Sequence, residues 1–334
     1  MHNFKFIYFQ NHPILVADQN HSAAVVYIKE NKFNVGKKAV EFIFFGNYFV
    51  GALAVALSLE CAFQLQIHFN SAAYYLLLFF GTVMYYTYAY SGILSTTRSV
   101  NPRTVWYASH YQFIRYSQPI LLVICIALSL LLLRRYYHNI LHLPLRYWLI
   151  IAVVSLAAVF YYGLSFLKIN LRNTGWLKAF IIGFVWACCV NLLPLVILQI
   201  ERGNYYADPV LMSWLFLKNW MFCTVNAIMF DLKDYEDDSN HQLKTFVVRY
   251  GLKKTIFFVL TPLLLIGVIS LLFFAEFRHF KPVVLIFNLV PFVLMLIVAW
   301  TMLRHKNILY YLIVIDGLLL VKALCGIAGS QFIH

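Results

Sequence analysis

Five of the chain's 13 acidic residues stand within the short stretch DLKDYEDD, which runs from Asp231 to Asp238. Asp231, Asp234 and Asp238 follow one another at i, i+3 and i+7, so on a helix they would project from one face. Carboxylates stacked in this way repel each other unless a cation lies between them. Mg²⁺ prefers oxygen ligands and is usually held by one or two carboxylates together with substrate phosphates. The spacing therefore predicts that these three residues bind Mg²⁺ and, through it, a diphosphate.

A second interpretation is that this stretch is a solvated acidic loop flanked by lysines. The residues after it favour the diphosphate hypothesis, because Lys244 and Arg249 are suitable cationic partners for phosphate oxygens. Asn226 precedes Asp231 by five residues, which places it near the mouth of the same site. It is also a polar residue within an apolar helix, where a hydrogen bond to a neighbouring helix is an equally good interpretation.

The elements that carry these residues must lie in a membrane. Hydrophobic residues make up 62% of the 334 residues, charged residues make up 12%, and the mean hydropathy is +0.75. A soluble domain could not bury that much apolar surface, whereas lipid can solvate it. Runs long enough to cross the hydrocarbon predict an all-α bundle of about nine transmembrane helices. These runs lie at 39–58, 73–95, 115–133, 147–165, 176–199, 210–231, 255–275, 282–303 and 308–330.

The distribution of positive charge predicts the orientation. Most of the 26 lysine and arginine residues fall in segments that share a side with the N-terminus, so we expect that side to be cytoplasmic. We expect residues 1–38 to form a cytoplasmic or interfacial segment and residues 39–330 the membrane domain, with long cytoplasmic loops near 96–114 and 232–254. The positive charge is spread over short loops, which argues against nucleic acid as a partner. We expect an integral protein of a bacterial inner (plasma) membrane, in contact with membrane lipid.

Two segments resemble a known family. The pattern D-x-x-D-x-x-x-D at Asp231, Asp234 and Asp238, followed by KTFVVRYG from Lys244 to Gly251, resembles the second Asp-rich region of the UbiA superfamily of intramembrane prenyltransferases. The segment Tyr161–Ala187 resembles that family's connection from the fourth to the fifth helix. Lys168 and Arg172 stand at its basic loop positions.

This resemblance implies a fold, a substrate and a reaction. The fold is a nine-helix bundle around a cavity open to lipid, in which Mg²⁺ ions held by two Asp-rich motifs bind a prenyl diphosphate. Ionisation of the diphosphate yields an allylic carbocation that alkylates a hydrophobic acceptor, aromatic or quinone-like. Metals and cationic side chains stabilise the charge that develops on the leaving group, and aromatic faces can flank the carbocation.

The chain departs from the family pattern in its first Asp-rich motif. That motif belongs in the loop near 96–114, but no Asp or Glu occurs between Glu60 and Glu201. One hypothesis is that Arg98, Arg103, Lys168 and Arg249 bind phosphate directly and that transferase activity survives, because arginine makes bidentate contacts with phosphate. The alternative is a catalytically inactive protein that binds isoprenoid lipids, since a fold does not guarantee a function.

Transport is a third hypothesis. Lys218, Asp316 and Lys322 are ionisable residues inside expected spans, and such residues often mark transport pathways. The other interpretation is that the two lysines snorkel to the interface and that Asp316 bonds within the bundle.

Overall fold

The computed structural model describes residues 5–9, 12–16, 35–91, 102–162, 175–203, 205–233, 235, 244–304 and 306–332. The chain divides into two compact units, Met1–Val40 and Glu41–His334. In the first unit, strands β1 (Lys5–Phe9) and β2 (His12–Val16) pair as an antiparallel hairpin, with Lys5 opposite Val16. In the second unit, the described secondary-structure elements are all helices.

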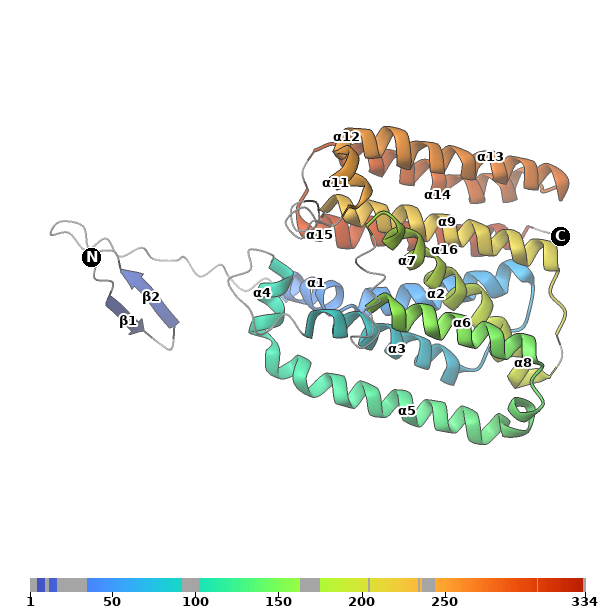
Figure 1. Ribbon diagram of the computed structural model, residues 1–334, viewed down its shortest axis with the longest axis horizontal. Coiled ribbons are helices and arrows are strands. Elements are labelled where there is room, and N and C mark those ends of the chain that lie inside the picture. Colours follow the sequence, from blue (N-terminus) through green and yellow to red (C-terminus); the bar gives the residue numbers. More distant parts are fainter. Residues whose placement is uncertain are drawn as a thin grey trace. The chain divides into compact units, whose positions relative to one another are not determined.

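After the hairpin, the described residues form the α-helices that Figure 1 labels. They are α1 (Val35–Phe45), α2 (Tyr48–Leu65), α3 (Ala72–Ser91), α4 (Pro102–Ser109), α5 (Tyr111–Leu141), α6 (Leu145–Tyr162), α7 (Leu177–Ala187), α8 (Leu193–Arg202), α9 (Pro209–Lys233), α11 (Phe246–Tyr250), α12 (Leu252–Thr255), α13 (Thr261–Phe277), α14 (Pro282–Thr301), α15 (Ile308–Tyr310) and α16 (Asp316–Ser330). Three π-helical turns join consecutive α-helices into longer rods: η4 (Cys188–Leu192), η5 (Ile256–Leu260) and η6 (Tyr311–Ile315).

Helices lie over each of the nine expected spans, and the all-α membrane fold is confirmed. Six stretches among the described residues are long and apolar enough to cross a membrane, and Leu145–Phe160 is a shorter apolar helix. The six are Tyr48–Leu65, Tyr111–Leu141, Leu177–Arg202, Leu252–Phe277, Pro282–Thr301 and Ile308–Ser330. The number nine is therefore approximate. Helices α3 and α9 fall outside the six and carry polar residues, Asn226 and Asp231 among them, that line the interior of the bundle.

The first expected span, 39–58, has the wrong boundaries. Helix α1 ends at Phe45, and a new helix begins at Tyr48 and continues to Leu65. Asn47 adopts a left-handed conformation with φ 64° and ψ 11°, which asparagine tolerates better than most residues. The break therefore falls inside an apolar run, where hydropathy alone gives no sign of it.

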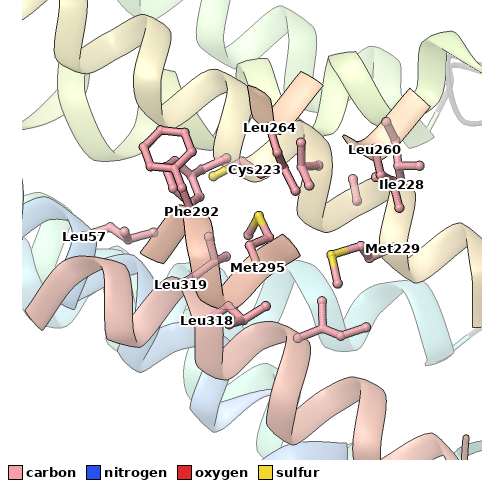
Figure 2. Packing of buried hydrophobic residues seen from close by; sticks show 14 of the residues in the cluster. Leu57, Cys223, Ile228, Met229, Leu260, Leu264, Phe292, Met295, Leu318 and Leu319 are labelled. Carbon is pink, nitrogen blue, oxygen red and sulfur yellow. The ribbon is translucent and has the colours of Figure 1, made fainter. Parts of the chain in front are cut away.

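The apolar core surrounds α9, which packs against α2, α7, α13 and α16 (Figure 1). Figure 2 shows Ile228 and Met229 of α9 among side chains of the neighbouring helices, including Leu264 of α13, Met295 of α14 and Leu319 of α16. Helix α5 is different, because most of its surface is exposed, and its main contacts among the described residues are with α3, α4 and α8. Such an exposed apolar surface is suited to contact with lipid.

Two of the ionisable residues within spans belong to a buried network. Lys322 Nζ donates to Glu60 Oε2 at 2.5 Å, and Lys218 Nζ lies 3.8 Å from Glu60 Oε1. Lys218 also donates to Asn288 Oδ1 at 2.9 Å and to Gln64 Oε1 at 3.3 Å. The interpretation that these two lysines snorkel is therefore wrong. A buried ammonium requires partners, and Glu60 on α2 supplies a carboxylate to both.

Candidate functional site: a cavity with one charged end

A cavity of about 590 Å³ lies inside the helical bundle. Helices α2, α3, α7, α8, α9 and α16 form most of its wall, and α4 and α6 contribute one residue each. Seven polar or charged side chains form what we call the charged end: Asn47, Arg103, Lys178, Asn226, Asp231, Lys233 and Asp316. A cavity of this size is typical of a small-molecule site.

Among the described residues of the acidic stretch, Asp231 is the carboxylate that lines the cavity. Its side chain is 3% exposed, and its Oδ1 lies 2.9 Å from Nζ of Lys178, at the start of α7. A carboxylate close to the C-terminal end of a helix faces the negative end of the helix dipole. Burial adds a further penalty for the ionised form unless the charge is paired. The Lys178 ammonium offsets both effects.

Gly183 positions this ion pair. A Cβ atom at Gly183 would lie 2.2 Å from Oγ1 of Thr224 and 2.7 Å from its backbone nitrogen. Helices α7 and α9 can therefore approach each other only because this residue has no side chain, as small residues allow in membrane helix pairs. The close packing brings Lys178, one end of α7, beside Asp231, near the end of α9.

Arg103 is held at the charged end by the break between α1 and α2. Its guanidinium donates to the Phe45 carbonyl oxygen at 3.2 Å and also to Oδ1 of Asn47. The Tyr107 hydroxyl donates to the same carbonyl at 2.9 Å. The last carbonyls of a helix lack intrahelical partners, so ending α1 at Phe45 provides an acceptor that fixes the arginine. Asn47 in turn donates to Oγ1 of Thr87 on α3 at 3.1 Å.

Asp316 and Lys233 complete the charged end. Asp316 is the first residue of α16 and Lys233 the last residue of α9, and both line the same cavity as Arg103. The π-helical turn η6 immediately before it leaves the Ile315 carbonyl to accept a hydrogen bond from Asn226 Nδ2 at 2.9 Å. Asn226 thus both lines the cavity and bonds a neighbouring helix, so its two interpretations hold together.

The rest of the cavity is apolar and aromatic. Tyr86 and Trp186 stand together, with the indole Nε1 donating to the Tyr86 hydroxyl at 2.6 Å. The Tyr85 hydroxyl donates to the carbonyl of Ala158 on α6 at 3.0 Å. Phe230 lies one residue before Asp231 and lines the same space. Aromatic faces of this kind attract a cation, and the aliphatic side chains beyond them suit a hydrocarbon chain.

The other expected site residues do not line the cavity or lie outside the described residues. Lys244 and Arg249 are exposed, and the Arg249 guanidinium stands over the ring of Tyr250 at 5.3 Å. The Lys244 backbone carbonyl would lie 2.6 Å from a Cβ atom at Gly175, whose φ is +64°. Arg98, Lys168, Arg172, Asp234 and Asp238 are outside the described residues. The roles of all seven stay predictions.

Sequence reasoning did not assign Lys178, Lys233 or Asp316 to this site. Lys178 and Lys233 are at the ends of apolar runs, where a lysine is also expected from membrane topology alone. Asp316 attracted attention only as a sign of transport. The available signal was an aspartate within one apolar stretch and two lysines at the ends of others, and nothing in the sequence shows that the three share one cavity.

A magnesium ion fits the charged end in part. Asp231 and Asp316 offer carboxylate oxygens there, and Mg²⁺ commonly binds through one or two carboxylates plus substrate phosphates. Asp231 is already paired with Lys178, so metal binding would require that ammonium to move towards the phosphate. Within the described residues, no three side chains of the His, Cys, Asp or Glu type cluster as metal ligands.

Comparisons with known proteins give the family. The model of the UbiA prenyltransferase family matches residues 119–308. A solved structure of digeranylgeranylglyceryl phosphate synthase superposes with a TM-score of 0.51 at 16% identity, covering 88% of this chain and 99% of that one. A UbiA homologue from Archaeoglobus fulgidus superposes with a TM-score of 0.51 at 12% identity, covering 88% and 98%. Curated proteins gave no match. Because the family model covers more than half of the sequence, this chain belongs to the UbiA prenyltransferase family.

Proposed function

We propose that this protein binds a prenyl diphosphate in the cavity and transfers its prenyl group to a hydrophobic acceptor, aromatic or quinone-like. The observation that carries the proposal is the charged end itself. Arg103, Lys178 and Lys233 stand where an apolar and aromatic cavity terminates. A molecule with a diphosphate head and a hydrocarbon tail complements both parts, because cationic side chains bind phosphate oxygens and apolar walls bind the tail.

Several groups of the cavity have a part in the proposed reaction. Arg103 and Lys178 donate to the oxygens of the terminal phosphates, and Arg103 is oriented by the Phe45 carbonyl. The bond between the first prenyl carbon and the diphosphate oxygen breaks, and its electron pair leaves with the diphosphate. The acceptor then forms a bond to that carbon, and the proton it releases passes to the departing diphosphate. Tyr86, Trp186 and Phe230 flank the allylic cation and exclude water from it.

Magnesium belongs to this proposal as a partner of the leaving group. Asp231, with Asp234 and Asp238 from the same acidic stretch, would hold the ion. A bound Mg²⁺ supplies charge neutralisation as the diphosphate departs. Arg103 comes from the region in which the family places its first Asp-rich motif. We infer that its guanidinium takes over part of the diphosphate binding from the missing carboxylates.

The second candidate function is an inactive isoprenoid-lipid-binding protein. The ion pair between Lys178 and Asp231 favours it, because an ammonium already neutralises the carboxylate that would bind metal. Transport is not proposed. Lys218 and Lys322 pair with Glu60, and Asp316 lines the same cavity as Asp231.

The test uses purified full-length protein in lipid nanodiscs, a series of labelled prenyl diphosphates, Mg²⁺ and a membrane lipid extract. We expect binding together with pyrophosphate release, and we expect Asp231→Asn combined with Asp234→Asn to abolish the Mg²⁺-dependent part. Asp237→Asn is the matched control, because on a helix Asp237 would lie off the face that the spacing predicts for the three motif residues. Tight binding without pyrophosphate release would favour the inactive protein. Unchanged binding in the double variant would contradict the assignment of the metal site.

The cellular placement is part of the same proposal. We propose that the protein is integral to a bacterial inner (plasma) membrane, with its N-terminus and the charged end on the cytoplasmic side. The excess of basic residues on that side supports it. Reporter fusions at the N-terminus and within the loop at 232–254 should both report the cytoplasm, and a periplasmic signal from either would contradict the orientation.

A further inference from the structure

A second hollow, of about 360 Å³, lies on the flank of the bundle that faces α5. Its walls include Leu132, Leu133 and Ile140 of α5, Trp148 of α6 and Ile200 of α8. We call this hollow the flank groove. Its lining is almost wholly apolar, so it suits a hydrocarbon and not a polar ligand.

Two side chains line both the cavity and the flank groove. Leu77 of α3 and Ile197 of α8 belong to the wall of each. Both are half-buried, and both have hydrocarbon side chains that form no hydrogen bonds. Rotation between staggered rotamers moves such side chains without breaking a hydrogen bond. The cavity and the groove are therefore separated at this point by a partition of two aliphatic side chains.

Polar contacts join the helices at the part of the flank groove that Glu201 lines. Glu201, which lines it, accepts from Oγ of Ser71 at 2.5 Å and from the Ser71 backbone nitrogen at 2.9 Å. Nearby, Asn139 Nδ2 donates to the Ile200 carbonyl at 2.7 Å and ties α5 to α8. These bonds hold the start of α3, the end of α8 and α5 together. The helices that form the groove are thus fixed to one another by hydrogen bonds, and Leu77 and Ile197 are the lining residues that it shares with the cavity.

The dimensions agree with a single extended ligand. Leu77 precedes Tyr86 by nine residues on α3, which corresponds to roughly 14 Å along a helix. A diphosphate at the charged end would therefore place the first part of its prenyl chain beside Tyr86 and Trp186. The chain would reach Leu77 and Ile197 further on. A short chain would end before the partition, whereas a longer one would meet it.

We propose that the flank groove receives the distal end of the prenyl chain and that Leu77 and Ile197 determine which chain lengths are accepted. This inference rests on the proposed function, because it requires a prenyl diphosphate in the cavity. The groove continues the cavity through carbon-only side chains. A flexible isoprenoid tail is therefore its occupant, in preference to a protein segment that would bring backbone polar groups into an apolar site.

The experiment compares variants of the full-length protein in nanodiscs. Leu77→Trp and Ile197→Trp fill the partition, and Leu76→Trp is the matched control, because Leu76 is the neighbouring leucine on α3, is 47% exposed and lines neither hollow. The probes are geranyl, geranylgeranyl and longer polyprenyl diphosphates, and the readouts are the dissociation constant and pyrophosphate release. We expect the two partition variants to bind the geranyl compound as the wild type does. Their affinity for the longest compound should fall by about tenfold for every two methylene groups excluded.

A second pair of variants distinguishes a change in chain-length preference from a folding defect. Leu77→Ala and Ile197→Ala widen the partition, and we expect them to shift the preference towards longer chains. Equal losses at every chain length, or no change at any, in proteins with wild-type unfolding temperatures would overturn the inference. The inference would also be overturned if a bilayer phospholipid were recovered from the flank groove and the longest prenyl diphosphate failed to displace it. A wild-type protein that binds no prenyl diphosphate at all would instead overturn the proposed function, and this inference with it.

Discussion

The Nζ atom of Lys178 lies 2.9 Å from Oδ1 of Asp231, and both side chains line the cavity. The pair joins α7 to α9 at the end of the cavity where the other charged groups gather. A buried carboxylate without a cation would be strongly unfavourable, so the lysine is needed even before a ligand arrives. In the proposed reaction, the same ammonium would turn to the phosphate, and Asp231 would then be able to hold a metal ion.

Lys178→Met should therefore lower both stability and ligand binding. Removing one partner of a buried ion pair costs about 3–5 kcal/mol, so the unfolding temperature in nanodiscs should fall. The unfolding temperature of Asp231→Asn should fall by a smaller amount. The double variant should be more stable than the sum of the two single effects predicts, because neither charge then stays unpaired. Thermal unfolding of the four proteins gives this cycle. Additive effects would show that the two side chains do not interact.

Arg103→Lys should weaken binding of a prenyl diphosphate by about tenfold or more while leaving the fold intact. A lysine keeps the charge but lacks the planar fork with which arginine can hold the Phe45 carbonyl, Asn47 and a phosphate at once. Arg115→Lys is the control, because Arg115 is exposed on α5 and does not line the cavity. Titration calorimetry measures both. An Arg103→Lys protein with wild-type affinity would remove this residue from the site.

Glu60→Gln should destabilise the protein without changing its affinity for a prenyl diphosphate. The substitution leaves Lys218 and Lys322 close together inside the bundle without a carboxylate, and a loss of about 3–5 kcal/mol is expected. None of these three residues lines the cavity. Glu276→Gln, at an exposed position on α13, is the control and should unfold as the wild type does. A large change in affinity, measured below the unfolding temperature, would connect the buried network to the site.

Asp208 should make stability depend on pH in the acidic range. Hydrogen bonds from the backbone nitrogens of Leu211 and Val210, together with the Arg278 guanidinium 2.6 Å away, hold the pKa of its carboxyl below the usual range. A lowered pKa in the folded state means that the stabilisation is present above the unfolded-state pKa and is lost as the pH falls through the folded-state pKa.

Asp208→Ala should thus cost about 1 kcal/mol at neutral pH, and its difference from the wild type should shrink as the solution is acidified. Asp208→Asn keeps an acceptor at the start of α9 without titrating, so it separates the cap from the charge. Unfolding temperatures across the pH series give the answer. A difference in unfolding temperature between Asp208→Ala and the wild type that stays constant as the pH falls would contradict this account.

Much of the fold was predictable because apolar length is a local property. Helices lie over every expected span within the described residues, and the membership of the UbiA family, suggested by the residues from Asp231 to Gly251, is confirmed by the family model. The start of the first span was not predictable, since Gly46 and Asn47 interrupt the helix within a run that hydropathy reads as continuous.

The residues of the charged end were predictable only where a sequence motif indicated them. Asp231 and Asn226 were expected near a site, and Arg103 was considered as a phosphate partner. Lys178 was missed because its partner is more than fifty residues away on another helix, and only packing through Gly183 brings the two together. Lys218 and Lys322 were misread for the same reason, since Glu60 lies on a third helix.

The break at Gly46 and Asn47 has a consequence for how such a site can diverge. The acceptor that fixes Arg103 is a main-chain carbonyl, Phe45 O, and a carbonyl is present whatever side chain stands at that position. Substitutions along α1 can therefore accumulate without loss of the anchor, provided that the helix still ends there. An arginine held by a main-chain carbonyl is not marked by any sequence motif. Other members of the family that lack an acidic motif can therefore be examined for an interrupted first helix.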